Sequence, residues 1–569
     1  MITQKWRTSE RKYGVIEERN VTIPMSDGVN IDCDLFRPDS KGKFPGILGI
    51  QCYDKIPQTA PMMPSYMTAK NAAYEAGDPN FYVRRGYGQV VINVRGSGRS
   101  GGYYSNYGPR EVQDTYEIID WMAHQPWCDG NVGMFGVSYY AVAQQQVAAL
   151  NPPQLKCIFA PFGYTDFYRD KFYHGGILGH GFMRHWADAI DNCRAASWSR
   201  EKMGQKSFDE LRAKVLQDKD ISAVPYLVEA LKNPERGGNA LLVDILMNPL
   251  DGPYYQERDV KYENDIKVPS YLGACWANYG LHLAGAFRSW ENIKSAPKKM
   301  IIGPPIYLDR PLYQYHYESL RWFDHWMKGV ENGILEEPPI KLFVMNTGEW
   351  KSAESWPLPE TKWTPFYLHF NGLLSEHEFW PGEGPDIFED NRARHGSLKY
   401  SSPPMVENTE VIGPMVLNLY ASTTDTEALW FVSLFDVAPD GEERLLTRGW
   451  LRGSQRPIDP KRSKAWKPFH PHTKREPLTP GEIYEFNIEV LPTGNLFKTG
   501  HRIGLKIGLV DDEPPQDFMQ VVGTGHLWRQ TPSMVTVYHD ADHPSHLLLP
   551  ITRGNIIGTY MSGGKLTLG

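Results

Sequence analysis

The chain has few cysteines for its length, and none of them form a pair of the kind that binds zinc. Its 569 residues include six cysteines, which are spread along the chain without a CxxC motif. This spacing predicts reduced, mostly buried thiols and argues against a zinc site. We expect neither a metal ion nor another cofactor.

Runs of one charge and long apolar runs are also missing. The net charge is −7, and the acidic and basic residues are interspersed, with no basic stripe for nucleic acid or an anionic membrane. No stretch of 18 apolar residues occurs, and the opening MITQKWRTSERKYG lacks the apolar core of a signal peptide. We therefore expect a soluble, cytoplasmic protein that acts on a small molecule and binds neither nucleic acid nor membrane. The sequence is compatible with either a monomer or a homodimer.

The pattern of strand and helix signals divides the chain into three kinds of sequence. Up to residue 155, short apolar strands alternate with amphipathic helices, as in a mostly parallel sheet with helices on both faces. This pattern returns at 256–345, after a helical and aromatic stretch at 156–255. From 346 to 569, short strands alternate with Pro/Gly turns. We predict an α/β core at 1–155 and 256–345, a helical cap at 156–255 and a C-terminal β jelly roll at 346–569.

A serine lies where a predicted strand gives way to a predicted helix, in GMFGVSYYAVAQQQVAAL at 133–150. Its motif resembles the G-x-S-x-G turn of serine hydrolases, except that Tyr140 occupies the fifth position. Such a turn lifts the serine Oγ above the sheet, and the amide of the next residue, here Tyr139, can bond an oxyanion. Alone the motif is a common chance match. The strand before it and the helix after it make Ser138 a candidate nucleophile.

A second glycine-rich motif, RGSGRSGG at 95–102, matches the G-x-G-x-x-G of dinucleotide-binding proteins. The residues that follow, YYSNYGPR, cannot form the apolar helix that such a site requires. No acidic residue ends a second strand some 20 residues later, because Asp120 lies inside a predicted helix. We interpret the motif as a permissive loop.

Several segments together resemble one hydrolase family. They are RGSGRSGG, DTYEIIDWMAHQPWCDGNVGMFGVSYYAVAQQQVAAL, NPPQLKCIFAP, FDHWMKG, DGEERLLTRGWLRGSQRP and FKTGHRIGLKIGL. Over nearly its whole length the chain resembles the cocaine esterase/NonD hydrolases, relatives of the X-Pro dipeptidyl-peptidases. The resemblance implies an α/β-hydrolase core, a helical cap and a C-terminal jelly roll. It also implies that Ser138 is the nucleophile and that the Tyr53 hydroxyl completes an oxyanion hole with the Tyr139 amide.

The resemblance breaks at the residues that would activate the serine. The position of the family's acid holds Asn278, and the position of its histidine corresponds to Tyr307. Asparagine supplies no charge, and tyrosine, with a pKa near 10, is only about one-thousandth ionised at neutral pH. His282, four residues after Asn278, is the leading substitute base. Weaker candidates are His174, His180, His185, His316 and His325.

Three functions follow from this pattern. Because two triad positions are replaced, our leading prediction is a non-hydrolytic enzyme of the cyclase, isomerase, lyase or decarboxylase type. It would use the oxyanion hole on a hydrophobic, carbonyl-containing small molecule. The alternative is a serine hydrolase with Ser138 as nucleophile and a displaced base such as His282. A non-catalytic binding protein is disfavoured, because Ser138 and Tyr53 are both retained.

Overall fold

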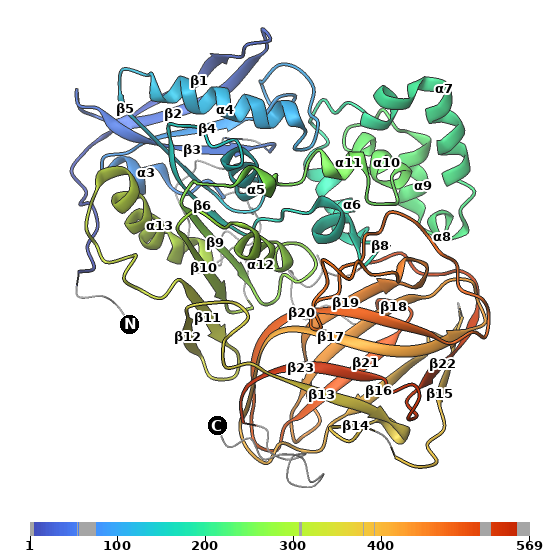
Figure 1. Ribbon diagram of the computed structural model, residues 1–569. Helices are drawn as coiled ribbons and strands as arrows, with labels where there is room; N and C mark the ends of the chain where they lie inside the picture. Colours follow the sequence, from blue (N-terminus) through green and yellow to red (C-terminus); the bar gives the residue numbers. More distant parts are fainter. Residues whose placement is uncertain are drawn as a thin grey trace.

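Two large β-sheets, one two-stranded β-sheet and a group of helices make up the described part of the fold (Figure 1). The structure is a computed structural model, and it describes residues 5–53, 55, 75–305, 310–378, 380–391, 393–512 and 525–554.

The first sheet has ten strands. In spatial order they are β1 (Val15–Pro24), β2 (Asn30–Pro38), β4 (Gly88–Asn93), β3 (Phe44–Gln51), β5 (Cys128–Phe135), β6 (Leu155–Pro161), β9 (Ser270–Cys275), β10 (Lys298–Gly303), β11 (Ile340–Val344) and β12 (Glu349–Ala353). The strands from β4 to β11 in this order are parallel, whereas β1, β2 and β12 are antiparallel to their neighbours. Every residue of β3, β4 and β9 is buried, as expected for parallel strands covered on both faces.

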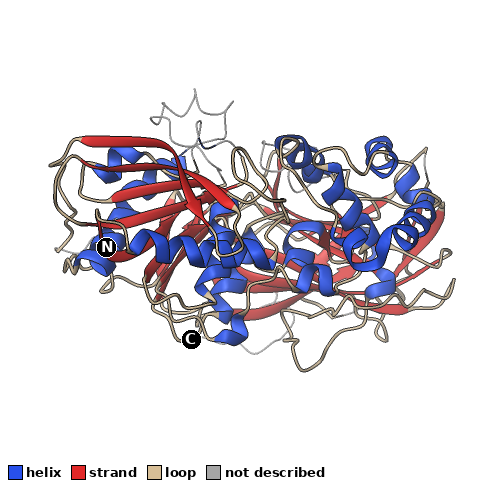
Figure 2. Cartoon of the chain, turned by 90° about the horizontal axis from the view of Figure 1, so that it is seen from above, coloured by secondary structure: helices blue, strands red, loops and turns tan. Residues whose placement is uncertain are grey.

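Helices cover both faces of this sheet, and two glycines show which helix lies on which face. Gly46 of β3 pairs with Val132 of β5, so their side-chain positions share a face, and Gly133 faces the other way. A Cβ at Gly46 would meet Met122, whereas a Cβ at Gly133 would meet Met327. Met122 belongs to α4 (Pro109–Ala123) and Met327 to α13 (Arg310–Lys328), so these two helices lie on opposite faces. Figure 2 shows helices flanking the strands. The helices of the core are α3 (Pro79–Val83), α4 (Pro109–Ala123), α5 (Tyr139–Ala148), α12 (Leu283–Asn292) and α13 (Arg310–Lys328).

A mostly helical segment connects β6 to β9, and in Figure 1 its helices α7, α9 and α10 stand apart from the first sheet. Its elements are the π-helix η1 (Phe167–Phe172), β7 (Tyr173–His174), β8 (Ile177–Leu178), α6 (Gly181–Ala189), α7 (Trp198–Val215), α8 (Lys219–Ser222), α9 (Pro225–Lys232), α10 (Asn239–Met247), α11 (Pro253–Gln256) and η2 (Tyr262–Asn264). This is the predicted helical cap. Its limits at 156 and 255 stay predictions, as do the other domain limits.

The second sheet has eleven strands and closes on itself. In spatial order they are β15 (Asp386–Asp390), β22 (Ser533–Tyr538), β17 (Thr409–Thr423), β20 (Tyr484–Phe497), β19 (Glu443–Arg452), β18 (Leu429–Val437), β21 (Arg502–Gly508), β16 (Ser397–Ser401), β14 (Leu373–Ser375), β13 (Lys362–His369) and β23 (His546–Arg553). Short 3-10 turns η3 (Phe370–Gly372) and η4 (Gly453–Gln455) follow β13 and β19. An additional pairing of β17 with β23 joins distant members of this order. The closure leaves few strand edges, although β15 stays at an edge with β22 as its one partner in the sheet.

The predicted fold class, an α/β-hydrolase with a helical cap and a C-terminal jelly roll, is confirmed by this arrangement. Among the described residues, no helix is long and apolar enough to cross a membrane.

Candidate active site

Ser138 occupies a strained turn between β5 and α5. Its φ of 58° and ψ of −116° lie outside the regions that residues with a side chain normally adopt. Gly136 has a φ of 141°, and a Cβ there would lie 2.4 Å from the Cβ of Tyr140. The turn thus requires glycine at 136 and presents Ser138 at the carboxyl end of β5, in the strand–turn–helix context that the motif predicts.

Tyr140 departs from the usual small residue of this motif, and the neighbouring strand makes room for it. A Cβ at Gly49 of β3 would lie 3.0 Å from the Tyr140 ring, so the ring packs where β3 has no side chain. Tyr140 is fully buried in a small cluster with Ala76 and Val91. The turn therefore accommodates Tyr140 at the fifth position of the motif.

The backbone amide of Tyr139 is the first N–H of α5. Within the described part of the chain, no hydrogen bond occupies it, and the amino end of a helix carries partial positive charge. The side chain holds the residue firmly, because its hydroxyl donates to Glu111 at 2.9 Å and its ring stacks on Tyr107 at 4.0 Å. The amide is therefore fixed and able to bind an oxyanion next to Ser138.

Tyr53 follows β3, the parallel neighbour of β5, and its ring lies 6.1 Å from that of Tyr139. Its hydroxyl accepts a hydrogen bond of 3.4 Å from the indole of Trp186, which leaves the hydroxyl proton available to a substrate. Burial raises the pKa of Tyr53 well above its usual value, so the proton stays in place at neutral pH.

A buried ion-pair cluster anchors the segment that carries Tyr53. Two residues further on, the Nζ of Lys55 lies 2.7 Å from Asp32 and 2.8 Å from Asp34, both on β2. Lys55 is 2% exposed, so these pairs tie the end of β3 to the neighbouring part of the sheet.

Asn278 and His282 contact each other directly. The Nδ2 of Asn278 lies 2.6 Å from the Nδ1 of His282, and both side chains are buried. The Asn278 carbonyl also accepts hydrogen bonds from the amides of His282 and Leu283, so one turn leads into α12. A 180° rotation of the amide would place Oδ1 against Nδ1–H and leave Nε2 as a base. This is how an asparagine orients a catalytic histidine in Cys-His-Asn enzymes.

The protonation of His282 is set by its surroundings. Burial, and to a smaller extent the positive charge of Lys171, lowers the pKa of His282 to about 3. The ring is therefore neutral at pH 7. The side chain beside its Nδ1 is the uncharged amide of Asn278, which does not strengthen the ring as a base in the way that an aspartate would.

The order of the strands brings these groups to one edge of the sheet. Ser138 follows β5, Asn278 follows β9, and β6 lies between the two strands. Because neighbouring strands are about 4.8 Å apart, the two chain segments leave the sheet roughly 10 Å from each other. The gap is occupied by residues that follow β6: Phe162 and Tyr164 pack against the His282 ring, with centroids 5.9 and 6.0 Å away. Tyr307 lies outside the described residues, so its predicted role stays a prediction.

The other histidines that we considered have other surroundings. His316 accepts a hydrogen bond from the Asp78 amide and stacks on Tyr82, so it is a packing residue of the core. His325 packs beside Trp326. His180 is buried in the cap, and His185 lies exposed on α6.

Lys171, on the π-helix η1, is the residue that sequence reasoning missed. It is 2% exposed, its Nζ donates to the Tyr164 hydroxyl at 2.8 Å, and it lies 3.7 Å from the centroid of the Trp186 ring. Burial lowers its pKa well below the usual value. Its sequence context, TDFYRDKFYHG, has one weak signal: a lysine within a run of aromatic residues.

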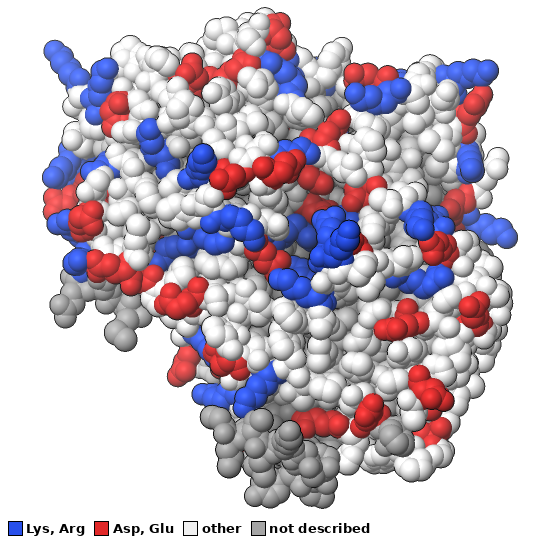
Figure 3. Space-filling view, in the orientation of Figure 1, with Lys and Arg blue, Asp and Glu red and all other residues white. Residues whose placement is uncertain are grey.

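The largest cavity that we describe lies where the core, cap and jelly roll meet. It measures about 310 Å³, and its walls include Asp170 of η1 and Tyr279, the neighbours of Lys171 and Asn278. Basic side chains that precede β20, such as Arg462 and Lys464, are among its lining residues. Figure 3 shows Lys and Arg gathered across the middle of the face that it draws. The cavity thus adjoins the segments that carry the candidate site.

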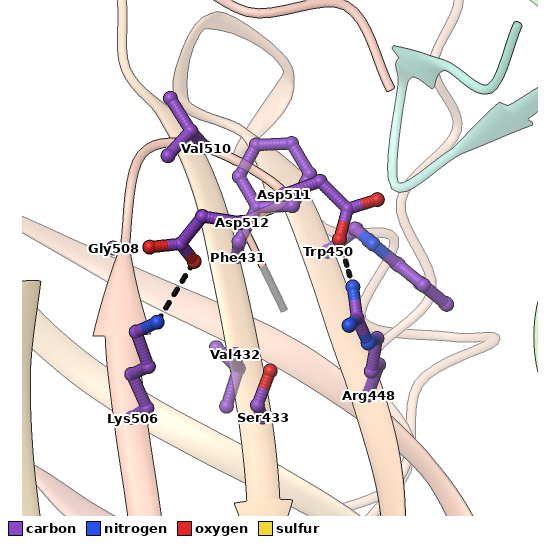
Figure 4. Close-up of a pocket in the computed structure, with 10 residues that line it drawn as sticks. All are labelled: Phe431, Val432, Ser433, Arg448, Trp450, Lys506, Gly508, Val510, Asp511 and Asp512. Atoms are coloured by element: carbon purple, nitrogen blue, oxygen red, sulfur yellow. Dashed lines mark hydrogen bonds and ion pairs between the residues drawn. The ribbon is translucent and has the colours of Figure 1, made fainter. Parts of the chain in front are cut away.

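A much smaller cavity of about 10 Å³ lies within the jelly roll. Two ion pairs line it, Arg448 with Asp511 and Lys506 with Asp512 (Figure 4). This space holds about one water molecule, so it is not a substrate site.

Asp511 also starts a chain of hydrogen bonds from the jelly roll to the cap. Its carboxylate accepts from Nδ1 of His526 at 2.8 Å, and Nε2 of His526 lies 2.7 Å from Nδ1 of His174. His174 therefore takes part in an interdomain contact, which accounts for its burial. Within the described ranges, no group of three His, Cys, Asp or Glu residues is arranged to hold a metal ion.

Comparisons with known protein families agree with this geometry. The family described as X-Pro dipeptidyl-peptidase (S15 family) matches residues 27–306. The family described as the X-Pro dipeptidyl-peptidase C-terminal non-catalytic domain matches residues 332–548.

Individual relatives cover almost the whole chain. A putative serine esterase of Mycobacterium bovis is 27% identical over 96% of this chain and 97% of its own. The cocaine esterase of a Rhodococcus species is 26% identical over 94% and 98%. A crystal structure of a CocE/NonD family hydrolase from Staphylococcus aureus has 26% identity and a TM-score of 0.77, covering 97% and 98% of the two chains. Each of these relatives is named as an esterase or a hydrolase. They favour our alternative, a serine hydrolase, and give the leading prediction of a non-hydrolytic reaction no support.

Proposed function

Because the chain belongs to the CocE/NonD hydrolases, the α/β-hydrolase relatives of the S15 X-Pro dipeptidyl-peptidases, we propose that it is a serine hydrolase that cleaves esters of hydrophobic small molecules. The observation that carries this proposal is the strained turn at Ser138, followed directly by the amino end of α5. Backbone strain of this kind is retained where the surrounding structure enforces it, and it is common at active sites.

The proposed reaction uses the groups at the carboxyl edge of the sheet. Ser138 Oγ attacks the ester carbonyl, and the developing oxyanion accepts hydrogen bonds from the Tyr53 hydroxyl and the Tyr139 amide. One such donor contributes about 10²–10³ in rate. His282, oriented by Asn278, is the proposed proton acceptor. The alcohol then leaves, and water hydrolyses the acyl-enzyme.

The proposed substrate class follows from the residues around these groups. Aromatic side chains flank each of these groups: Trp186 donates to Tyr53, Tyr107 stacks on Tyr139, and Phe162 and Tyr164 pack against His282. A hydrophobic acyl or alcohol part suits such surroundings, because its burial contributes about 25 cal/mol per Å².

Covalent labelling tests the proposal. A fluorophosphonate probe should label Ser138 in the full-length protein, and the label should be located there by peptide mass spectrometry. Ser138→Ala should abolish both the label and the hydrolysis of p-nitrophenyl esters. Ser97→Ala is the matched control, because Ser97 is buried in a loop and its hydroxyl donates to the Val94 carbonyl. Ester turnover that survives in Ser138→Ala would contradict the proposal.

One observation favours a second candidate function. Asn278 and the low pKa of His282 leave the serine with a weak base, which suits a reaction that needs oxyanion stabilisation but no nucleophile. An isomerase or lyase of this kind would leave Ser138 unlabelled and would keep its activity in Ser138→Ala.

A further inference from the structure

Aromatic rings enclose the amine of Lys171 beside the candidate site. Its Nζ lies 3.7 Å from the ring centroid of Trp186 and 4.9 Å from those of Tyr164 and Phe172. Among the described residues, no carboxylate lies within 4 Å of this nitrogen. Burying an ammonium ion without a counter-ion is costly, and the group tends to lose its proton instead. The surroundings therefore favour a free amine, although the rings offset part of this cost when it is charged.

The backbone that carries Lys171 is itself unusual. Lys171 lies in the π-helix η1, between Asp166, which caps the element by accepting from the Arg169 amide, and Phe172. π-Helical turns are rare and are frequent at functional sites. On the same element, Asp170 pairs with Arg288 at 2.8 Å, so its carboxylate is committed to another partner.

A hydrogen bond connects Lys171 to the sheet edge of the candidate site. Its Nζ lies 2.8 Å from the Tyr164 hydroxyl, and Tyr164 follows β6, the strand between those that lead to Ser138 and Asn278. The Tyr164 ring stacks on His282, with centroids 6.0 Å apart. Trp186, which covers the amine, donates to Tyr53. Tyr164 thus contacts His282, the candidate base, directly. Lys171 contacts Trp186, which in turn bonds to Tyr53, the oxyanion donor.

We propose that Tyr164 and Lys171 form a proton-transfer pair for Ser138, in which Tyr164 is a catalytic residue and Lys171 a positioning residue that holds the proton. This inference rests on the proposed function, and it adds a second proton path beside His282. The side chain that contacts His282 Nδ1 is the uncharged amide of Asn278, whereas an amine is intrinsically a stronger base than an imidazole.

The proposed step balances without any further reactant. As the bond from Ser138 Oγ to the carbonyl carbon forms, the Oγ–H bond breaks. Its proton passes to the Tyr164 oxygen, directly or through one water, while the Tyr164 hydroxyl proton passes to the Lys171 amine. The Lys171 ammonium then returns a proton along the same path to the oxygen of the leaving alcohol. In deacylation, the attacking water supplies the proton, which returns to Ser138.

The pair can accept a proton only while Lys171 is a free amine. Burial lowers the pKa of Lys171 well below its usual value; the Cys52 thiol raises it to a smaller extent, and Arg258 lowers it further. Among the described residues, further titratable groups that act on the pair are Tyr53, Tyr107, Glu75 and His282. Below the pKa of the amine the pair is already protonated. The rate of acylation should therefore rise with pH as Lys171 loses its proton.

The pH dependence of labelling tests this inference. The rate at which a fluorophosphonate modifies Ser138 is measured from pH 5 to pH 10 in the full-length protein and in Lys171→Met and Tyr164→Phe. The wild type should show a rise with pH, and both variants should lose that rise. At pH 9 their rates should be lower by roughly 10²-fold, the usual size of one general-base contribution. Lys171→Arg should behave like Lys171→Met, because a guanidinium does not accept a proton.

Two matched variants control for the loss of a buried lysine or tyrosine. The Nζ of Lys299, which is 3% exposed, donates to the Ile334 carbonyl at 2.7 Å, and the Tyr255 hydroxyl donates to the Asn248 carbonyl at 2.7 Å. Lys299→Met and Tyr255→Phe should keep the wild-type pH profile. If Lys171→Met does not fold, the test depends on Tyr164→Phe, which removes a single oxygen and disturbs the packing least.

The outcomes separate this inference from the proposed function. A pH-dependent rise that persists in Tyr164→Phe, or labelling rates at pH 9 in Lys171→Met and Tyr164→Phe that equal the wild-type rate, would overturn the proton-transfer pair. Failure to label Ser138 in the wild type at any pH would overturn the proposed hydrolase itself.

Discussion

The substitution Asn278→Asp is expected to convert His282 into an effective base. The side chain at 278 contacts Nδ1 of His282 at 2.6 Å, so an introduced carboxylate and a protonated ring would have their charges about 4 Å apart. At an effective dielectric constant of about 20, that attraction is about 4 kcal/mol, or about three pKa units. The pKa of His282 should rise from about 3 to roughly 6, within the range of working general bases.

The assay is the hydrolysis of p-nitrophenyl acetate between pH 5 and pH 9. The variant should gain at least about tenfold in kcat/KM at pH 7 because the ring holds a proton more strongly. The gain has an upper bound of about 10⁴, the loss that serine proteases suffer when the carboxylate behind their histidine becomes an amide. The profile should show a new ionisation near pH 6.

The matched control is the same substitution in a His282→Gln background, where the gain should vanish. Because Asn278 is fully buried, the new carboxylate also carries a desolvation penalty, and a melting curve must show that the variant is folded. A folded Asn278→Asp variant without any gain, or with an equal gain in the absence of His282, would refute the assignment of His282 as a base.

Three further predictions test the oxyanion hole, the turn and the buried histidine. Tyr53→Phe should lower kcat by about 10²–10³ with little change in KM, because the hydroxyl that Trp186 leaves free to donate is lost; an unchanged kcat would exclude this donor. Gly136→Ala should destabilise the fold or abolish fluorophosphonate labelling, since the added methyl would lie 2.4 Å from the Cβ of Tyr140; a folded, normally labelled variant would show that the turn tolerates a side chain. His282 is buried with its pKa lowered to about 3, so the unfolded chain binds the extra proton first. Its contribution is complete above about pH 6.5 and is lost as the pH falls. The free energy of unfolding should drop by about 2 kcal/mol more between pH 7 and pH 5 in the wild type than in His282→Gln, as measured by urea titration; equal drops would contradict the low pKa.

The sequence by itself determined the architecture and the nucleophile's setting. Alternation of apolar strands with amphipathic helices, and later of short strands with turns, depends on residues a few positions apart, so it can be recognised without a structure. The same holds for Ser138, because a strand, a glycine and a helix adjoin it in the chain. The contact of His282 with Asn278 also has a local cause, since four residues make one helical turn.

The tertiary structure decided which side chains surround that serine. Lys171 and Tyr164 are seven residues apart, and neither has a motif, yet a π-helical turn brings the amine onto the hydroxyl. The indole that contacts the Tyr53 hydroxyl belongs to Trp186, 133 positions further along the chain. The tolerance for Tyr140 depends on Gly49 of a neighbouring strand. These contacts exist because parallel strands bring their carboxyl ends to one edge and the cap then packs over it, and that convergence has no local pattern in the sequence.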